Sequence, residues 1–221
     1  GAATFSQEPD EIIRDSLLQR LVRWAPGTPY DEAEIERLRS SLVALDYFGL
    51  VEVLPQPDTV GDGADADRIV PVQVNLTPAP RSIYTVGLSY GTLSGAGVSG
   101  GIERRYLNDR GHKALAQVEY ANRRKMATLQ YRVPAFAWLD GWYAASLQAV
   151  DELSDYVNSR RLELVGSRSG RYNDHLNLVA SMHVLRERWA YNVADDGEGA
   201  LAPSDFLYAS FVFPQLSAQY V

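Results

Sequence analysis

Apolar and polar residues alternate along most of the chain after residue 80. In the segment 83–92, apolar residues at every second position (Tyr84, Val86, Leu88 and Tyr90) are separated by small or polar ones. Because successive side chains of a strand point to opposite faces, this pattern predicts a strand with one apolar and one small, polar face. The same period predicts eight antiparallel strands, at residues 83–92, 96–106, 112–122, 126–134, 142–152, 160–168, 175–188 and 204–214.

The first 78 residues contain two stretches with a helical period. The first stretch is predicted to begin at Pro9 or Asp10 and to end at the breaker sequence WAPGTP, and its apolar stripe is Ile13, Leu17, Leu18, Leu21 and Val22. The second stripe is Ile35, Leu38, Leu42 and Leu45. Asp31 followed by Glu34 has the spacing of a capping box, so the second helix is predicted to begin there. Asp46 occupies the position at which helices often end in the left-handed conformation.

Short strands flank these helices. A strand pattern is present in three segments, ATFS, GLVEVLP and RIVPVQVNLTP. The expected order of elements is therefore β-α-α-β-β. Pro71 cannot donate to a sheet ladder, which favours an edge position or a bulge for the last strand. We expect one core, formed by Leu17, Leu21, Ile35, Leu38, Leu42, Val51 and Val72.

Alternation alone does not identify the solvent that the apolar face meets, because a soluble sheet also has one apolar face. The predicted strands are about ten residues long, which is the length of a tilted membrane-crossing strand. Aromatic residues near the predicted strand ends resemble the girdle of a membrane barrel; they are Tyr106, Tyr120, Tyr131, Trp138 and Trp142. Polar residues such as Glu119, Gln130 and Arg132 on the other face suit a wet lumen. These features favour an outer-membrane barrel, and a soluble barrel or sandwich remains open.

Composition narrows the possible partners. The net charge of −7 and the pI of about 5.0 give nucleic-acid binding no electrostatic support. Cysteine is absent, and no apolar run is long enough for a transmembrane helix. The opening GAATFSQEPD does not resemble a signal peptide, so the chain is expected to be either cytoplasmic or a segment of a larger protein.

No residue pattern indicates catalysis or a cofactor. The three histidines, His112, His175 and His183, lack metal-ligand spacing. The acidic stretches GDGADAD and VADDGEG do not fit a calcium loop, and GAGVSGG does not lead into a helix that would bind phosphate. We therefore expect no enzymatic activity, no metal and no cofactor.

The stretch PGTPYDEAEIERLRSSLVALDYFGLVEVLPQP resembles the end of a POTRA (polypeptide-transport-associated) domain. The matching residues are Pro26, Gly27, Pro29, Tyr30, Leu42, Tyr47, Phe48, Val51 and Val53. Asp46 departs from the family, which usually has glycine there. The resemblance implies that residues 1–80 form the last POTRA domain, an α+β unit that lies in the periplasm.

Residues 84–134 resemble the opening strands of the barrel of the outer-membrane assembly superfamily, of the TamA type. The matching residues are Tyr84, Val86, Gly87, Tyr90, Thr92, Gly111, His112, Tyr131, Arg132 and Pro134. The resemblance implies that residues 81–221 are the N-terminal half of a sixteen-stranded transmembrane barrel in the Gram-negative outer membrane. The barrel would assist the insertion or secretion of unfolded client proteins, together with an inner-membrane partner. The Arg-Gly-Phe or Arg-Gly-Tyr motif of the family's second half does not occur here.

The resemblance also implies a functional strand. In the family, the first barrel strand forms a weak seam at which client strands are thought to pair. Here that gate strand contains Tyr84, Val86, Gly87, Leu88, Tyr90 and Gly91. The glycines Gly87 and Gly91 would leave its inner face thinly packed, or they would simply relieve crowding in an ordinary first strand.

Three alternatives remain beside the TamA-type interpretation: BamA, the transporter of a two-partner secretion system, and a passive pore or soluble ligand-binding barrel. With the POTRA domain in the periplasm, the longest connection, at residues 188–203, is expected to be extracellular. The connection PAFAWLDG is then expected to be periplasmic, with Trp138 and Trp142 near the inner interface.

Overall fold

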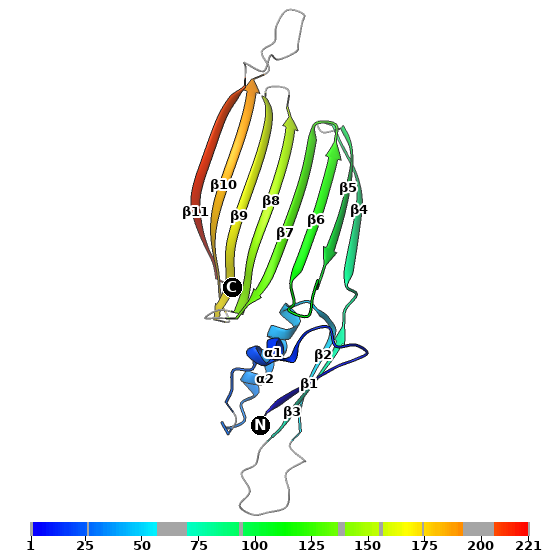
Figure 1. The fold of residues 1–221 in the computed structure, drawn as a ribbon, viewed down its shortest axis with the longest axis vertical. Helices are drawn as coiled ribbons and strands as arrows, with labels where there is room; N and C mark the ends of the chain where they lie inside the picture. The colour runs from blue at the N-terminus through cyan, green and yellow to red at the C-terminus, as the bar shows by residue number, and fades with distance from the viewer. Residues whose placement is uncertain are drawn as a thin grey trace, which may run out of the picture. The chain divides into compact units, whose positions relative to one another are not determined.

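The computed structural model describes eight stretches of the chain, at residues 2–25, 27–56, 70–92, 95–136, 140–154, 157–173, 175–191 and 206–220. The chain divides into two compact units (Figure 1). The first unit consists of Gly1–Arg81 and the turn Arg105–His112, and the second of Ser82–Arg104 and Lys113–Val221.

The first unit has the predicted order β-α-α-β-β. Its elements are β1 (Ala3–Gln7), α1 (Asp15–Leu18), the 3-10 helix η1 (Gln19–Leu21), α2 (Glu32–Ala44), β2 (Phe48–Pro55) and β3 (Val72–Pro78). The sheet order is β1-β3-β2, with β1 parallel and β2 antiparallel to β3. Pro71 therefore precedes the central strand, so the predicted edge position was wrong. Pro71 lies outside the ladder, and its carbonyl accepts a hydrogen bond from the Gln56 amide at 2.9 Å.

The first helix is shorter than predicted and begins later. The Gln7 side chain donates to the Ile13 carbonyl at 2.6 Å and accepts from the amides of Ile12 and Ile13 at 3.1 Å. A side chain that occupies these backbone groups offers the segment an alternative to helical hydrogen bonds. The helix consequently starts after Arg14, while Ile13 is fully buried.

The second helix agrees with its predicted ends. The Asp31 side chain accepts a hydrogen bond from the Ala33 amide at 2.9 Å, which satisfies a donor that the first turn leaves free. Glu34 pairs with Arg37 at 2.5 Å rather than completing the reciprocal capping box. Asp46 has a φ of 56°, as its position after the helix predicted.

The core of the first unit contains most of the predicted residues. Leu21, Leu38, Leu42, Val51 and Val72 are buried, whereas Leu17 and Ile35 are only half-buried. Further buried residues were absent from the predicted core; Leu45 belongs to the second helical stripe, whereas Tyr47, Phe48, Val74 and Leu76 lie outside both stripes.

The second unit is one antiparallel sheet of eight strands in chain order. The strands are β4 (Ser82–Gly91), β5 (Gly95–Arg104), β6 (Lys113–Ala121), β7 (Arg124–Ala135), β8 (Asp140–Leu153), β9 (Val157–Asn173), β10 (Leu176–Tyr191) and β11 (Leu207–Tyr220). All eight predicted strands are present, and β4 and β11 are the two outer strands of the sheet order (Figure 1). Strands β8 to β11 are longer than predicted, and β9 has the largest difference, with 17 residues from Val157 to Asn173.

The two faces of this sheet have different chemistry. We call the face that carries Tyr84, Leu129, Leu147, Leu164 and Val212 the outward face, and the opposite one the inward face. Val86 and Leu88 on the outward face of β4 are each 85% exposed, and Leu216 of β11 is 84% exposed. The inward face carries polar residues from β6 to β10, among them Gln117, Thr128, Gln130, Gln148 and Glu163. The predicted alternation between an apolar and a polar face is thus confirmed.

Candidate functional site

Strand β4 has one hydrogen-bonded neighbour. It pairs with β5 from Ser82 opposite Arg104 to Gly91 opposite Gly95, and no other strand pairs with it among the described residues. In an antiparallel pair, alternate residues direct their N–H and C=O groups away from the partner. The outer side of β4 is therefore a row of backbone donors and acceptors that can receive another strand.

The side chains of β4 differ strongly between its two faces. On the outward face, Tyr84 is 70% exposed and Tyr90 is 83% exposed. On the inward face, a side chain at Gly87 would meet the Ser99 hydroxyl at 2.5 Å. Gly87 thus leaves room for the Ser99 hydroxyl, which fits the interpretation that the glycines relieve crowding, and the thinly packed inner face stays a prediction.

A polar chain of three residues lies on the inward face of β9 and β10. The Ser181 hydroxyl lies 2.9 Å from His183 Nε2, and His183 Nδ1 lies 2.8 Å from a carboxylate oxygen of Glu163. The sequence suggested none of this, because Glu163 precedes His183 by twenty residues. The order hydroxyl, imidazole, carboxylate matches that of a serine hydrolase triad.

The surroundings of Ser181, His183 and Glu163 do not complete a hydrolase site. Such a site needs preorganised donors aimed at the developing oxyanion. Ser181 and its neighbours lie in the middle of β10, which is paired to β9 on one side and β11 on the other, so their amides belong to the ladders. The His183 ring stacks on Phe213 with centroids 4.8 Å apart. The arrangement connects side chains of three adjacent strands, β9, β10 and β11.

The remaining histidines lie apart from this cluster. His112 is in the turn of the first unit, and His175 is next to the start of β10. Within the described stretches, no group of three His, Cys, Asp or Glu residues is arranged to hold a metal ion. No helix in those stretches is long and apolar enough to cross a membrane.

The predicted aromatic girdle is only partly on the outward face. Tyr120 and Tyr131 are 60% and 43% exposed there. Tyr106 lies beyond the end of β5, in the turn that belongs to the first unit, where Arg81 lies 5.6 Å from its ring centre. Trp142 alternates with outward Tyr143 and so lies on the inward face, with Lys113 Nζ 5.3 Å from its ring centre. Tyr106 and Trp142 therefore do not join an outward girdle, and Trp138 lies outside the described residues.

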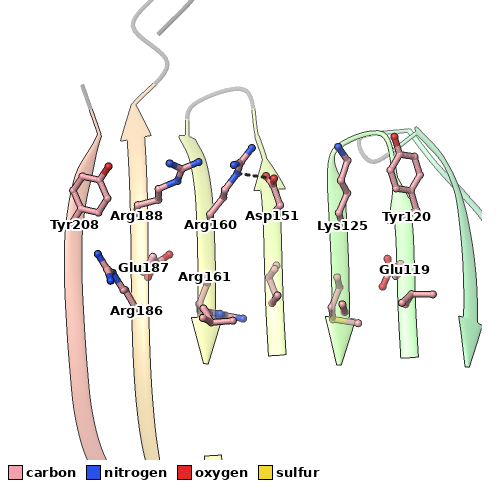
Figure 2. Close-up of a pocket in the computed structure, with 16 residues that line it drawn as sticks. Glu119, Tyr120, Lys125, Asp151, Arg160, Arg161, Arg186, Glu187, Arg188 and Tyr208 are labelled. Atoms are coloured by element: carbon pink, nitrogen blue, oxygen red, sulfur yellow. Dashed lines mark ion pairs between the residues drawn. The ribbon is translucent and has the colours of Figure 1, made fainter. Parts of the chain in front are cut away.

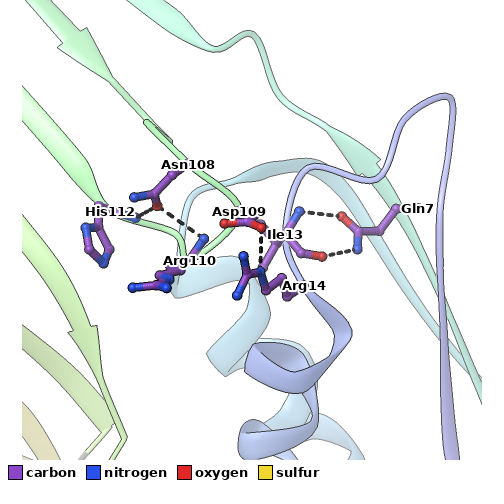
Figure 3. A network of polar contacts seen from close by, with 7 residues as sticks. All are labelled: Gln7, Ile13, Arg14, Asn108, Asp109, Arg110 and His112. Atoms are coloured by element: carbon purple, nitrogen blue, oxygen red, sulfur yellow. Dashed lines mark hydrogen bonds and ion pairs between the residues drawn. The ribbon is translucent and has the colours of Figure 1, made fainter.

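Side-chain contacts fasten the turn Arg105–His112 within the first unit, and Figure 3 shows one of them, between Arg14 and Asp109. The buried Tyr47 hydroxyl donates to the Gly111 carbonyl, Arg14 pairs with Asp109, and Arg105 pairs with Asp46 at 3.1 Å. Burial raises the pKa of the Tyr47 hydroxyl far above its usual value. We call this set of contacts the turn clasp. It joins residues of the stretch that resembles a POTRA domain to residues of the stretch that resembles the barrel family.

Comparison with known proteins places the fold. No protein-family model and no curated protein sequence matches the chain. Among solved structures, BamA from Haemophilus ducreyi lacking POTRA domains 1–3 is similar, with a TM-score of 0.69 and 13% identity over the whole of this chain. CdiB from Acinetobacter baumannii and CdiB from Escherichia coli have TM-scores of 0.59 and 0.57, each at 11% identity over the whole chain. The chain spans 44% of the BamA structure and 42% of each CdiB structure, so it has the fold of less than half of these proteins.

Proposed function

We propose that this chain is part of an outer-membrane assembly or secretion protein, with strand β4 as the edge that receives client strands. The observation that carries the proposal is the position of β4 at the edge of the sheet that the described residues form, with an apolar outward face, in a fold similar to BamA. On this proposal, residues 1–80 are a periplasmic POTRA domain and residues 81–221 are half of a sixteen-stranded barrel. The protein has no enzymatic role.

The proposed mechanism is β-augmentation. A client strand would form backbone hydrogen bonds with β4, and these bonds do not depend on the client's sequence. The inward face of β4 carries small groups such as Gly87 and Ser89, so it presents few side chains that would obstruct a client strand. The outward apolar side chains of β4 would remain in lipid while the client strand pairs.

The finer assignment within the superfamily is to a TamA-type factor, which works with an inner-membrane partner. It is supported by the match of Tyr131, Arg132 and Pro134 to that type. The fold similarity to CdiB keeps a two-partner secretion transporter as the second candidate, in which the client passes through the lumen.

Site-specific cross-linking separates these proposals, because the chain has no native cysteine. Ser89→Cys places a thiol on the inward face of β4, and Ser146→Cys places one on the inward face of the interior strand β8. In the full-length protein, we expect disulfides between Ser89→Cys and single cysteines in the terminal strand of an unfolded barrel client. Cross-links from Ser146→Cys alone would support passage through the lumen and reject the edge mechanism. The absence of cross-links at both positions would reject both mechanisms.

A further inference from the structure

A groove lies on the outward face, toward the end of the sheet opposite the start of β4. It has a volume of 710 Å³. Ala127 of β7 and Ala149 of β8 form its floor, because their small side chains lie between larger ones on β6 and β9. Figure 2 shows Lys125, Arg160 and Arg188 near the ends of their strands at this groove.

The strand register arranges the outward side chains into rows. The first row crosses six strands and consists of Tyr120, Lys125, Asp151, Arg160, Arg188 and Tyr208. The second row, two residues further from the strand ends, is Val118, Ala127, Ala149, Leu162, Arg186 and Ser210. The third row is entirely apolar and consists of Ala116, Leu129, Leu147, Leu164, Val184 and Val212. Charge thus changes to hydrocarbon over two steps, each about 7 Å long, which is the profile of a membrane interface.

The first two rows have an excess of positive charge. They contain four cations and one anion, in a chain whose net charge is −7. Arg160 pairs with Asp151 at 2.8 Å, whereas Lys125 lies over the Tyr120 ring and Arg188 over the Phe206 ring. Arg160 and Arg188 are directly opposite each other in the register, an arrangement of like charges that destabilises a sheet unless an anion lies between them.

We propose that this groove binds the head group of a phosphorylated glycolipid, with its acyl chains along the apolar third row. Arginine forks bind phosphate oxygens in a bidentate manner, and partial burial strengthens such contacts. Free phosphate would use the first row only, whereas a lipid also covers Ala127, Ala149 and the third row. The inference rests on the proposed function, because it requires the outward face to meet lipid. On the proposed function, the start of β4 is on the periplasmic side, so the first row, at the opposite strand ends, would meet the outer leaflet.

The test measures lipid binding to the full-length protein by native mass spectrometry in detergent. The probes are bisphosphorylated lipid A, its dephosphorylated form, and phosphatidylglycerol. We expect the bisphosphorylated probe to bind the unaltered protein about tenfold or more tightly than either of the others, since charge-assisted hydrogen bonds are lost without the phosphates. Equal affinity for all three probes would overturn the proposal.

Two pairs of substitutions locate the site. Arg160→Gln with Arg188→Gln removes the opposed cations of the first row, and we expect a loss of affinity of about tenfold or more. Arg171→Gln with Arg132→Gln removes two cations from the inward face that do not line the groove, and should change the affinity less than about twofold. Equal losses in the two pairs would overturn the proposal. The pair Arg160→Lys with Arg188→Lys keeps the charge and should retain part of the binding, which separates lost recognition from lost folding.

Two further results separate the occupants of the groove and the two proposals. Displacement of the lipid by millimolar inorganic phosphate would show a simple phosphate site and reject the lipid. Cross-linking at Ser89→Cys does not depend on Arg160 or Arg188, so lipid binding can fail while the proposed function stands. If the lipid binds but Ser89→Cys forms no cross-link to the client, only the proposal that β4 receives client strands is rejected.

Discussion

Removal of one hydroxyl from Tyr47 should loosen the turn clasp measurably. Tyr47→Phe keeps the fully buried ring in place and deletes only the donor to the Gly111 carbonyl. Loss of one partner from a buried hydrogen bond costs about 1–3 kcal/mol, because the remaining group is left without water. In the two ion pairs of the clasp, the side chains of Arg14 and Asp109 are each about half exposed, and those of Arg105 and Asp46 are 20% and 50% exposed. Such pairs contribute about 0–1 kcal/mol, so the Tyr47 bond should dominate.

The assay is hydrogen exchange of the full-length protein in detergent, read on peptides that cover residues 105–112. A loss of 1–3 kcal/mol raises the exchange rate of the clasped amides by about 5-fold to 150-fold when exchange follows local opening. The matched control is Tyr30→Phe, which alters an exposed tyrosine of the same unit and should leave these rates unchanged. Arg14→Gln should have a smaller effect than Tyr47→Phe. Unchanged exchange in Tyr47→Phe, or a larger effect from Arg14→Gln, would refute this ranking of the contacts.

Gly111 supplies an independent test of the same contact. It has a φ of +71°, and a methyl group there would meet the Tyr47 hydroxyl at 2.5 Å. Gly111→Ala should therefore destabilise the clasp through both backbone strain and collision. In the double variant with Tyr47→Phe the nearest obstacle is gone, so the combined cost should be smaller than the sum of the two single costs. Strict additivity would mean that the two residues act separately.

Three further predictions concern the pH dependence of the Tyr47 contribution, the packing of the second helix, and Ser181. Because burial raises the Tyr47 pKa above its usual 10.0, the unfolded chain ionises first, so this tyrosine's contribution to stability is present below pH 10 and falls as the pH rises above it. The destabilisation caused by Tyr47→Phe should accordingly shrink between pH 8 and pH 11 in denaturant titrations, and a constant difference would contradict the burial argument. Leu38→Ala should cost about 2–5 kcal/mol in the same titrations, whereas Val43→Ala, on the exposed side of the same helix, should cost less than about 0.5 kcal/mol. A fluorophosphonate probe should leave Ser181 unlabelled, and its covalent labelling would show that the polar chain on β10 is a hydrolase site after all.

The sequence predicted the strands well because each one carries a clean period of two over about ten residues. Their ends were less visible: β9 runs from Val157 to Asn173, beyond the predicted residues 160–168, and the small and polar residues of its end resemble a turn. The charged residues Asp151, Arg160 and Arg188 lie within the predicted strands, but only the register shows that they form one row. The first helix was overestimated because the Gln7 side chain competes for the backbone groups of Ile12 and Ile13, and a side-chain contact of that kind leaves no periodic signal.

The candidate sites differ in how far their prediction from the sequence required knowledge of the strand pairing. The edge strand β4 was predictable as the first member of a meander, from its place in the chain. The contact of Ser181 and His183 with Glu163 was not, because it requires the register of two strands. Trp142 was predicted to join the aromatic girdle because it lies near a strand end. Its face depends on the alternation of side chains along the strand, and since Tyr143 points outward, Trp142 points inward.

Hydrogen exchange of β4 in a lipid bilayer tests the central claim most directly. In the full-length protein without client, about half of the amides of Ser82–Gly91 should exchange rapidly, because alternate residues of an antiparallel strand point away from β5. The amides of β8, which is paired on both sides, should be protected throughout. Addition of an unfolded barrel client should protect the rapid amides of β4 and leave β8 unchanged. If β4 is as fully protected as β8 before any client is added, and stays so afterwards, the edge is closed and β4 is not the strand that receives clients.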